Sequence, residues 1–233
     1  MRLLGCWYSN NALDPKILGA SLNSIARAKD SSEGAEVEVR TCTWRVLPGS
    51  PFPGYITHFR LPVHLGIAMQ MLKVVYEEER AGRDYDAMLF LEHDVLYPHD
   101  YFDRVAAAFQ AGPELQGVSN RDYIGLNETG WVQVHTRHEP MHQLSLRCGF
   151  ARAHLETVLK NCILDGAALL EPDDKSKFGR LPFVGERPCV HVNHSGHFTT
   201  HFKIYETDSH GLTVHPYWGD FRDYYPEGEK SIR

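Results

Sequence analysis

Short apolar runs alternate with amphipathic segments in the first half of the chain. Residues 2–8 form an apolar run typical of a strand, and residues 36–41 alternate strictly, as in a strand with one covered face. In residues 87–98 an uninterrupted apolar stretch ends in an acidic cluster and a proline. An apolar stretch of this kind predicts a buried parallel strand that carries charge to its carboxyl end.

Helical patterns separate these predicted strands. Asp14 and Pro15 provide an N-cap and a first-turn proline for one helix. A longer apolar stripe predicts a helix over 61–80, and a third helix is expected over 100–110. Strands and helices that alternate in this way predict an α/β fold whose parallel sheet binds ligands at the carboxyl ends of its strands.

The second half of the chain has a weaker pattern. We expect strands at 117–120, 131–135 and 144–150, a helix over 153–162, a polar surface loop at 171–177 and a lid or active-site tail from Pro182 onward.

Composition narrows the class of protein. The chain is 42% hydrophobic and 23% charged, as in ordinary globular proteins. Its net charge of -6 argues against non-specific binding to nucleic acid or anionic membranes. The five scattered cysteines contain no CxxC pair, which favours free thiols in a reducing compartment. No apolar run reaches the length of a signal-peptide core or membrane span, so we expect a cytoplasmic protein.

The acidic cluster at the end of the 87–98 strand is the first candidate for chemistry. Residues two apart on a strand share a face, so Glu92 and Asp94 are expected to point together into a crevice and His93 away from it. Two convergent carboxylates make a site for a hard cation. The alternative interpretation is that these residues only mark where the strand leaves the core.

A histidine cluster is the second candidate. His191, His194, His197 and His201 follow one another at spacings of three, three and four, in a sequence that favours a loop over a helix. Histidine is a common metal ligand, and His194 and His197 are our first choices as ligands. Local packing or capping within a polar loop is the alternative.

These segments resemble the GT-A fold glycosyltransferases, a metal-dependent and here family-2-like class that uses nucleotide sugars. Residues 89–98 resemble the apolar strand, the Asp-x-Asp motif and the downstream proline of that family. Glu92 stands in place of the first aspartate, so the resemblance leaves Asp94 as the metal ligand. Residues 194–197 resemble the late histidine that completes the metal site, and residues 147–154 the strand-to-helix passage before the acceptor side.

The resemblance implies a GT-A-like, Rossmann-type, mostly parallel sheet flanked by helices, with an irregular C-terminal acceptor- and metal-binding region. It implies one domain over 1–233, with a nucleotide-binding half at 1–112 and an acceptor-side half and tail at 113–233. The implied reaction transfers a sugar from a nucleotide sugar, with a UDP-sugar as first choice, to a hydroxyl acceptor. A Mn²⁺ or Mg²⁺ ion would neutralise the leaving diphosphate. The acceptor is a glycan or, in a viral or phage enzyme working in host cytoplasm, a hydroxymethylated DNA base.

The same resemblance distributes roles among further residues. The residues expected to contact the nucleotide are Trp7, Tyr8, Ser9, Asn10, Arg60, Glu92 and His93. The candidates for the general base of an inverting transfer are Glu171, Asp173, Asp174 and Asp122. Each has a plainer alternative, because Trp7 and Tyr8 also suit a core, Arg60 a surface ion pair, and the acidic residues a loop.

Two other functions remain open on the sequence, and a nucleotidyltransferase is less favoured because no glycine-rich phosphate loop is found. One is a zinc-dependent hydrolase built on the late histidines, although no His-Glu-x-x-His helix is present. The other is a non-catalytic nucleotide- or sugar-binding module. If the acceptor is DNA, the second half offers a basic groove made of Arg121, Arg137, Arg147, Arg152, Lys175, Lys177 and Arg180.

Overall fold

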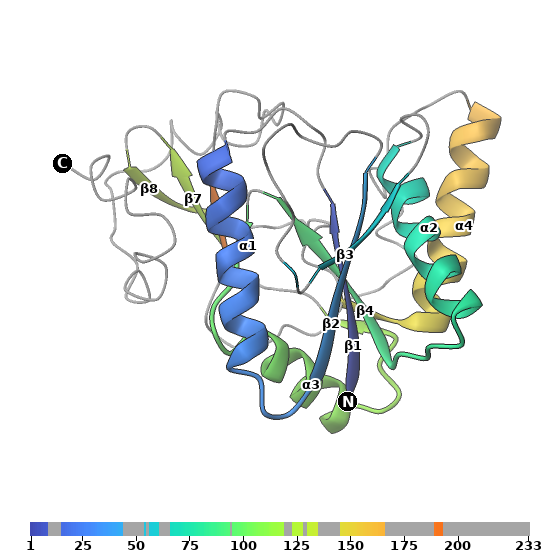
Figure 1. The fold of residues 1–233 in the computed structure, drawn as a ribbon, viewed down its shortest axis with the longest axis horizontal. Helices are drawn as coiled ribbons and strands as arrows, with labels where there is room; N and C mark the ends of the chain where they lie inside the picture. Colours follow the sequence, from blue (N-terminus) through green and yellow to red (C-terminus); the bar gives the residue numbers. More distant parts are fainter. Residues whose placement is uncertain are drawn as a thin grey trace.

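The fold is taken from a computed structural model that describes residues 1–8, 15–43, 54, 56–60, 66–93, 95–118, 123–127, 130–134, 145–165 and 189–192. These residues form an α/β arrangement with helices on both faces of a central sheet (Figure 1). No helix among them has the length and apolar content that a membrane span requires.

The central sheet has six strands in the order β3-β2-β1-β4-β9-β6. The strands are β1 (Arg2–Tyr8), β2 (Glu36–Thr43), β3 (Ile56–Arg60), β4 (Ala87–Glu92), β6 (Gly117–Val118) and β9 (Ser145–Arg147). The first four strands in this order run parallel, and β9 lies antiparallel between β4 and β6. The sheet is therefore mostly parallel, and the expected α/β class is confirmed.

Two pairs of helices cover the sheet. Helices α1 (Pro15–Asp30) and α3 (Tyr101–Ala111) pack on one face, and α2 (Gly66–Arg80) and α4 (Cys148–Asp165) pack on the other (Figure 1). Side chains of β1 alternate between the two cores, with Leu3 and Trp7 toward α1 and Leu4 and Cys6 toward α2 and α4. This alternation is the period of two that a strand buried on both faces requires.

A second sheet begins shortly after β4 of the first sheet ends. Its order is β5-β10-β7-β8, with β5 (Val95–Leu96), β10 (Cys189–Val192), β7 (Tyr123–Asn127) and β8 (Gly130–Val134). β10 pairs antiparallel with β5 and parallel with β7. The sequence pattern does not predict this sheet, because its strands are short and come from distant parts of the chain.

Several predicted elements are confirmed, one predicted strand is wrong in part, and one strand was missed. A helix begins at Pro15, as expected, and strands β1, β2 and β4 form where the apolar and alternating patterns predict them. The strand expected over 144–150 is wrong beyond Arg147, where α4 begins directly. Helical spacing prevails there because Ala151 and Leu155, four residues apart, are both fully buried. β3 was missed, since it follows a loop rich in proline and glycine.

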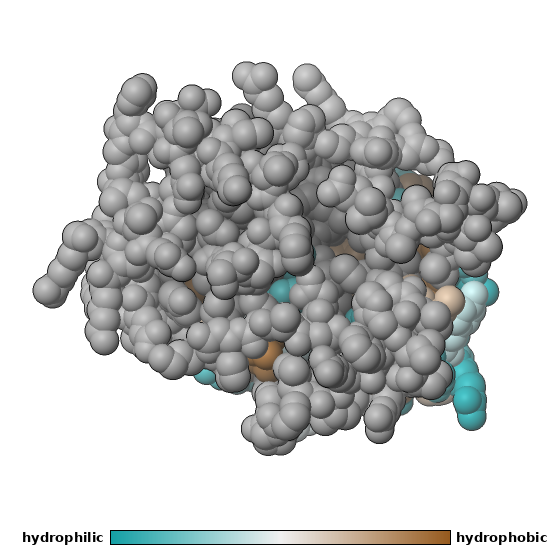
Figure 2. Space-filling model, turned by 90° about the horizontal axis from the view of Figure 1, so that it is seen from above, coloured by the Kyte–Doolittle hydropathy of each residue, from teal (hydrophilic) through white to brown (hydrophobic). Residues whose placement is uncertain are grey.

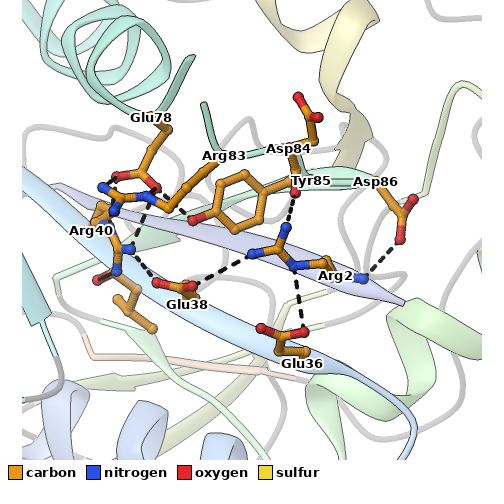
Figure 3. Close-up of polar contacts among 10 residues, drawn as sticks. Arg2, Glu36, Glu38, Arg40, Glu78, Arg83, Asp84, Tyr85 and Asp86 are labelled. Carbon is orange, nitrogen blue, oxygen red and sulfur yellow. Dashed lines mark hydrogen bonds and ion pairs between the residues drawn. The ribbon is translucent and has the colours of Figure 1, made fainter. Parts of the chain in front are cut away.

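Glu78, in a run of three glutamates near the end of α2, is buried. Its side chain is 2% exposed, and its carboxylate accepts hydrogen bonds from Arg40 Nε at 2.8 Å, Arg83 Nε at 2.8 Å and Tyr85 Oη at 2.5 Å (Figure 3). Arg40 lies on β2 and also pairs with Glu38. The cluster ties α2 to the sheet.

The pKa of Glu78 reflects two opposed effects. Burial alone would raise the pKa, because it disfavours the charged carboxylate. Hydrogen bonds from Arg83, Arg40 and Tyr85 outweigh burial and lower the pKa to about 2. Glu78 is thus ionised throughout the physiological range, and we assign the cluster a structural role.

Candidate active site at the carboxyl edge of the sheet

The strand order defines where a ligand would bind. From β1 the chain passes through α1 to β2 on one side of β1, whereas β4 lies on the other side and is reached through α2. The order therefore reverses between β1 and β4. Open α/β sheets bind ligands at the carboxyl ends of the strands at such a reversal.

The predicted acidic cluster lies at this edge. Glu92 is the last residue of β4 and stands in register with Tyr8, the last residue of β1. Arg60 closes β3 at the same edge, in register with Thr43 of β2. The backbone thus brings three of the predicted nucleotide contacts, Tyr8, Arg60 and Glu92, to one edge of the sheet.

The backbone of Glu92 is held from two sides. Ser21 Oγ on α1 donates to the carbonyl oxygen of Glu92 at 3.1 Å, and the amide of Glu92 donates to Tyr97 Oη at 2.7 Å. The amide of Tyr97 in turn donates to Ser24 Oγ at 3.0 Å. The sequence signal for these contacts is two serines in the buried stripe of α1. These hydrogen bonds fix the point at which the strand ends and the acidic cluster begins.

The side chains of β4 show which face Glu92 occupies. Met88 and Phe90 belong to the core beneath α2 and α4, whereas Leu89 and Leu91 belong to the core beneath α1. Strand alternation therefore puts Glu92 on the α2 face. His93 follows in a turn and is 4% exposed.

Trp7 occupies the core on the opposite face. Its side chain is 2% exposed and packs with residues of α1 and α3. In this structure the indole ring is therefore not presented to solvent at the edge, in agreement with the plainer of its two interpretations. For Tyr8 and Arg60, the structure describes the backbone alone.

The second sheet brings the histidine segment beside the acidic cluster. His191 of β10 pairs directly with Val95 of β5, which immediately follows Asp94 in the chain. β10 ends at Val192, two residues before His194. Two segments far apart in the sequence, each predicted to supply metal ligands, thus run side by side.

The predicted metal ligands, the proposed bases and two of the predicted nucleotide contacts lie outside the described residues. They are Asp94, His194 and His197; Asp122, Glu171, Asp173 and Asp174; and Ser9 and Asn10. Within the described ranges no three His, Cys, Asp or Glu side chains come together as a metal site would require. Their predicted roles remain predictions.

Gln70 is a further candidate that the sequence pattern does not single out. It lies on α2, is 1% exposed, and its side-chain amide has no hydrogen-bond partner in the described structure. The available signal was a polar residue among the apolar positions of the long helix.

Figure 2 faces the carboxyl edge from above, where the described residues appear as small, separate hydrophilic and hydrophobic patches.

Cysteine side chains are described at three positions. Cys6, Cys42 and Cys148 are free thiols, as expected from the sequence. Burial raises the pKa of Cys42 to about 11 and, with the nearby Asp86 and Glu79 carboxylates, that of Cys148 to about 12. These thiols stay protonated at neutral pH, as buried structural cysteines do.

Comparison with known proteins yields structural likenesses alone. No protein-family model matches the chain, and none of the curated proteins matches it. The crystal structure of A197 from STIV has a TM-score of 0.34 at 16% identity and covers 68% of this chain and 69% of its own. A mannose-1-phosphate geranyltransferase from Thermus thermophilus has a TM-score of 0.38 at 11% identity, covering 82% and 73%.

A third structure extends over nearly the whole chain. It is a glycosyltransferase involved in the glycosylation of the major capsid of PBCV-1, with a TM-score of 0.42 at 10% identity and 98% coverage of both chains. At these TM-scores and identities, none of the three assigns a family or an activity to this chain. The fold class rests on the sheets and helices described above.

Proposed function

We propose that the protein is a metal-dependent glycosyltransferase that moves a sugar from a nucleotide sugar to a hydroxyl acceptor. The observation that carries the proposal is the position of Glu92, which ends β4 beside the end of β1, where the strand order reverses. The pairing of His191 with Val95 supports it further, because it brings the histidine segment to the same place.

The donor groups around this edge suit a hard divalent cation. Glu92 and Asp94 offer carboxylate oxygens, which Mg²⁺ and Mn²⁺ prefer, and the backbone of Glu92 is already fixed by Ser21 and Tyr97. Asp94 and one of the late histidines, His194 or His197, would hold the ion. When bound, the ion would neutralise charge on the departing diphosphate.

The other roles fall to residues of the chain itself. Glu92, His93 and Arg60 would bind the sugar, ribose or phosphate groups of the donor, for which a UDP-sugar is our first choice. A carboxylate from Glu171, Asp173, Asp174 or Asp122 would take the proton of the acceptor hydroxyl in an inverting transfer. The acceptor is a glycan or a hydroxymethylated DNA base.

Calorimetry of nucleotide binding tests the proposal. UDP, GDP and CMP are titrated with and without Mn²⁺ into the wild type and into Asp94→Asn. We expect one nucleotide to bind in a Mn²⁺-dependent manner and this binding to be lost in the variant. Asp84→Asn is the matched control, because Asp84 is exposed and lies just before β4, at the amino end of the strand.

A different outcome would redirect the assignment. If no nucleotide binds under either condition, the glycosyltransferase proposal fails. Stoichiometric zinc in the purified protein would then favour the hydrolase. If a nucleotide binds but no sugar is transferred, the non-catalytic module is favoured instead.

A further inference from the structure

A buried amide without a partner lies on α2. Gln70 is 1% exposed, and neither its Oε1 nor its Nε2 has a hydrogen-bond partner within the described residues. An unpaired polar group in a buried position costs free energy, so an apolar residue would be expected there. The carboxamide therefore does not stabilise the free protein, which indicates that it serves another function.

The helix repeat shows which way Gln70 faces. Gln70, Val74 and Glu78 are four residues apart and lie on one stripe of α2. Glu78 bonds to Arg40 of β2 at 2.8 Å, so this stripe faces the sheet.

The contact between Glu78 and Arg40 also shows where Gln70 lies along the direction of the strands. α2 follows β3 and precedes the parallel β4, so it runs from the carboxyl edge back to the amino edge (Figure 1). Gln70 precedes Glu78 by eight residues, or about 12 Å of helix. β2 ends at Thr43, three residues beyond Arg40, or about 10 Å of strand. Gln70 is thus level with the carboxyl end of β2.

The packing of α2 on β2 agrees with this placement. Cys42, next to the end of β2, belongs to the same buried cluster as Met71 of α2, the residue after Gln70. The chain enters α2 from β3 at the carboxyl edge, so the positive end of the helix dipole also lies at this edge. A helix N-terminus and a buried, unpaired amide thus converge on the edge at which β4 presents Glu92.

We propose that the carboxamide of Gln70 binds the nucleoside half of the nucleotide, an inference that rests on the function proposed above. The amide is neutral and offers a donor and an acceptor together, which complements a base edge or ribose hydroxyls. α2 packs over β2 and β1, on the side of the reversal away from β4. The charged diphosphate belongs near β4 and the nucleoside near Gln70, which makes Gln70 a determinant of donor specificity.

Gln70→Met, which keeps the length of the side chain but removes the amide, separates this role from a structural one. We expect the thermal unfolding temperature of the free variant to equal or exceed that of the wild type. We expect its affinity for UDP in the presence of Mn²⁺ to fall at least tenfold. Inorganic pyrophosphate, which lacks the nucleoside, should bind both proteins equally.

Further measurements identify which part of the nucleoside Gln70 contacts, and further variants control for a folding defect. An equal loss of affinity for UDP and GDP indicates a ribose contact, and an unequal loss indicates the base edge. Gln110→Met is the matched control, because Gln110 is exposed on α3, and it should change nothing. Gln70→Leu carries the same expectation if the methionine variant fails to fold.

Two results would overturn the inference and leave the proposed function standing. One is a lower unfolding temperature with unchanged affinity for UDP, which would make the amide structural. The other is an equal loss of affinity for UDP and pyrophosphate, which would place Gln70 at the phosphates. If the wild type binds no nucleotide at all, the proposed function fails and the inference fails with it.

Discussion

Ser21 Oγ on α1 donates a hydrogen bond to the carbonyl oxygen of Glu92 at 3.1 Å, at the last residue of β4. Ser21 is fully buried, so its hydroxyl is shielded from water. It links the helix after β1 to the end of β4, across the point where the strand order reverses. The position of the acidic cluster is thus set by α1 as well as by the sheet.

Ser21→Ala removes this link. We expect the free energy of unfolding to fall by about 1 kcal/mol, the typical net value of a hydrogen bond. Mn²⁺-dependent nucleotide affinity should fall several-fold, since the backbone that carries the carboxylates is less well fixed. Urea denaturation and calorimetry measure the two effects. Asn23→Ala, at an exposed position on the same helix, should alter neither.

Tyr97→Phe tests the second support of Glu92. The variant keeps the buried ring but leaves the amide of Glu92 without the phenolic oxygen that accepts its hydrogen bond at 2.7 Å. An amide orphaned in the interior costs about 1–3 kcal/mol. This hydrogen bond is only partly buried, so the free energy of unfolding should fall by about 1 kcal/mol, the lower end of that range. An unchanged urea midpoint and slope would show that the hydroxyl contributes nothing to this edge.

Glu78→Gln is expected to destabilise the protein more strongly. It leaves the guanidinium of Arg40, whose side chain is 6% exposed, without its buried ionic partner. Removing one member of a buried pair typically costs about 3–5 kcal/mol. Glu77→Gln is the matched control, since Glu77 pairs with Lys73 at the surface and should cost below about 1 kcal/mol. Equal losses in the two variants would contradict the structural role of the cluster.

The same carboxylate predicts a pH dependence of stability. The pKa of Glu78 is about 2 in the folded protein, below its ordinary value of 4.5. Between these values the unfolded chain binds more protons, so the free energy of unfolding increases with pH. The contribution of Glu78 is complete above about pH 5 and is lost as the pH falls toward 2. Thermal melts at pH 5, 4 and 3 should show this loss, and Glu78→Gln should flatten it.

Much of the central sheet could be predicted from the sequence because its signals are local. The apolar run before Glu92 predicts a buried strand that ends in charge, and β4 is that strand. Pro15 predicts the start of α1. Such patterns depend on the alternation of neighbouring side chains and on backbone restraints within a few residues.

Local sequence patterns thus specify the α/β class, several strands and helices, and the acidic end of β4. Three features follow from tertiary contacts instead: β9 enters the central sheet, His191 lies opposite Val95, and Glu78 is buried while its neighbour Glu77 remains near the surface. Each of these outcomes depends on a partner far away in the chain. Strand pairing and the burial of a charge are stabilised by contacts between distant segments, and no local pattern of hydrophobic and polar residues records which segments will meet.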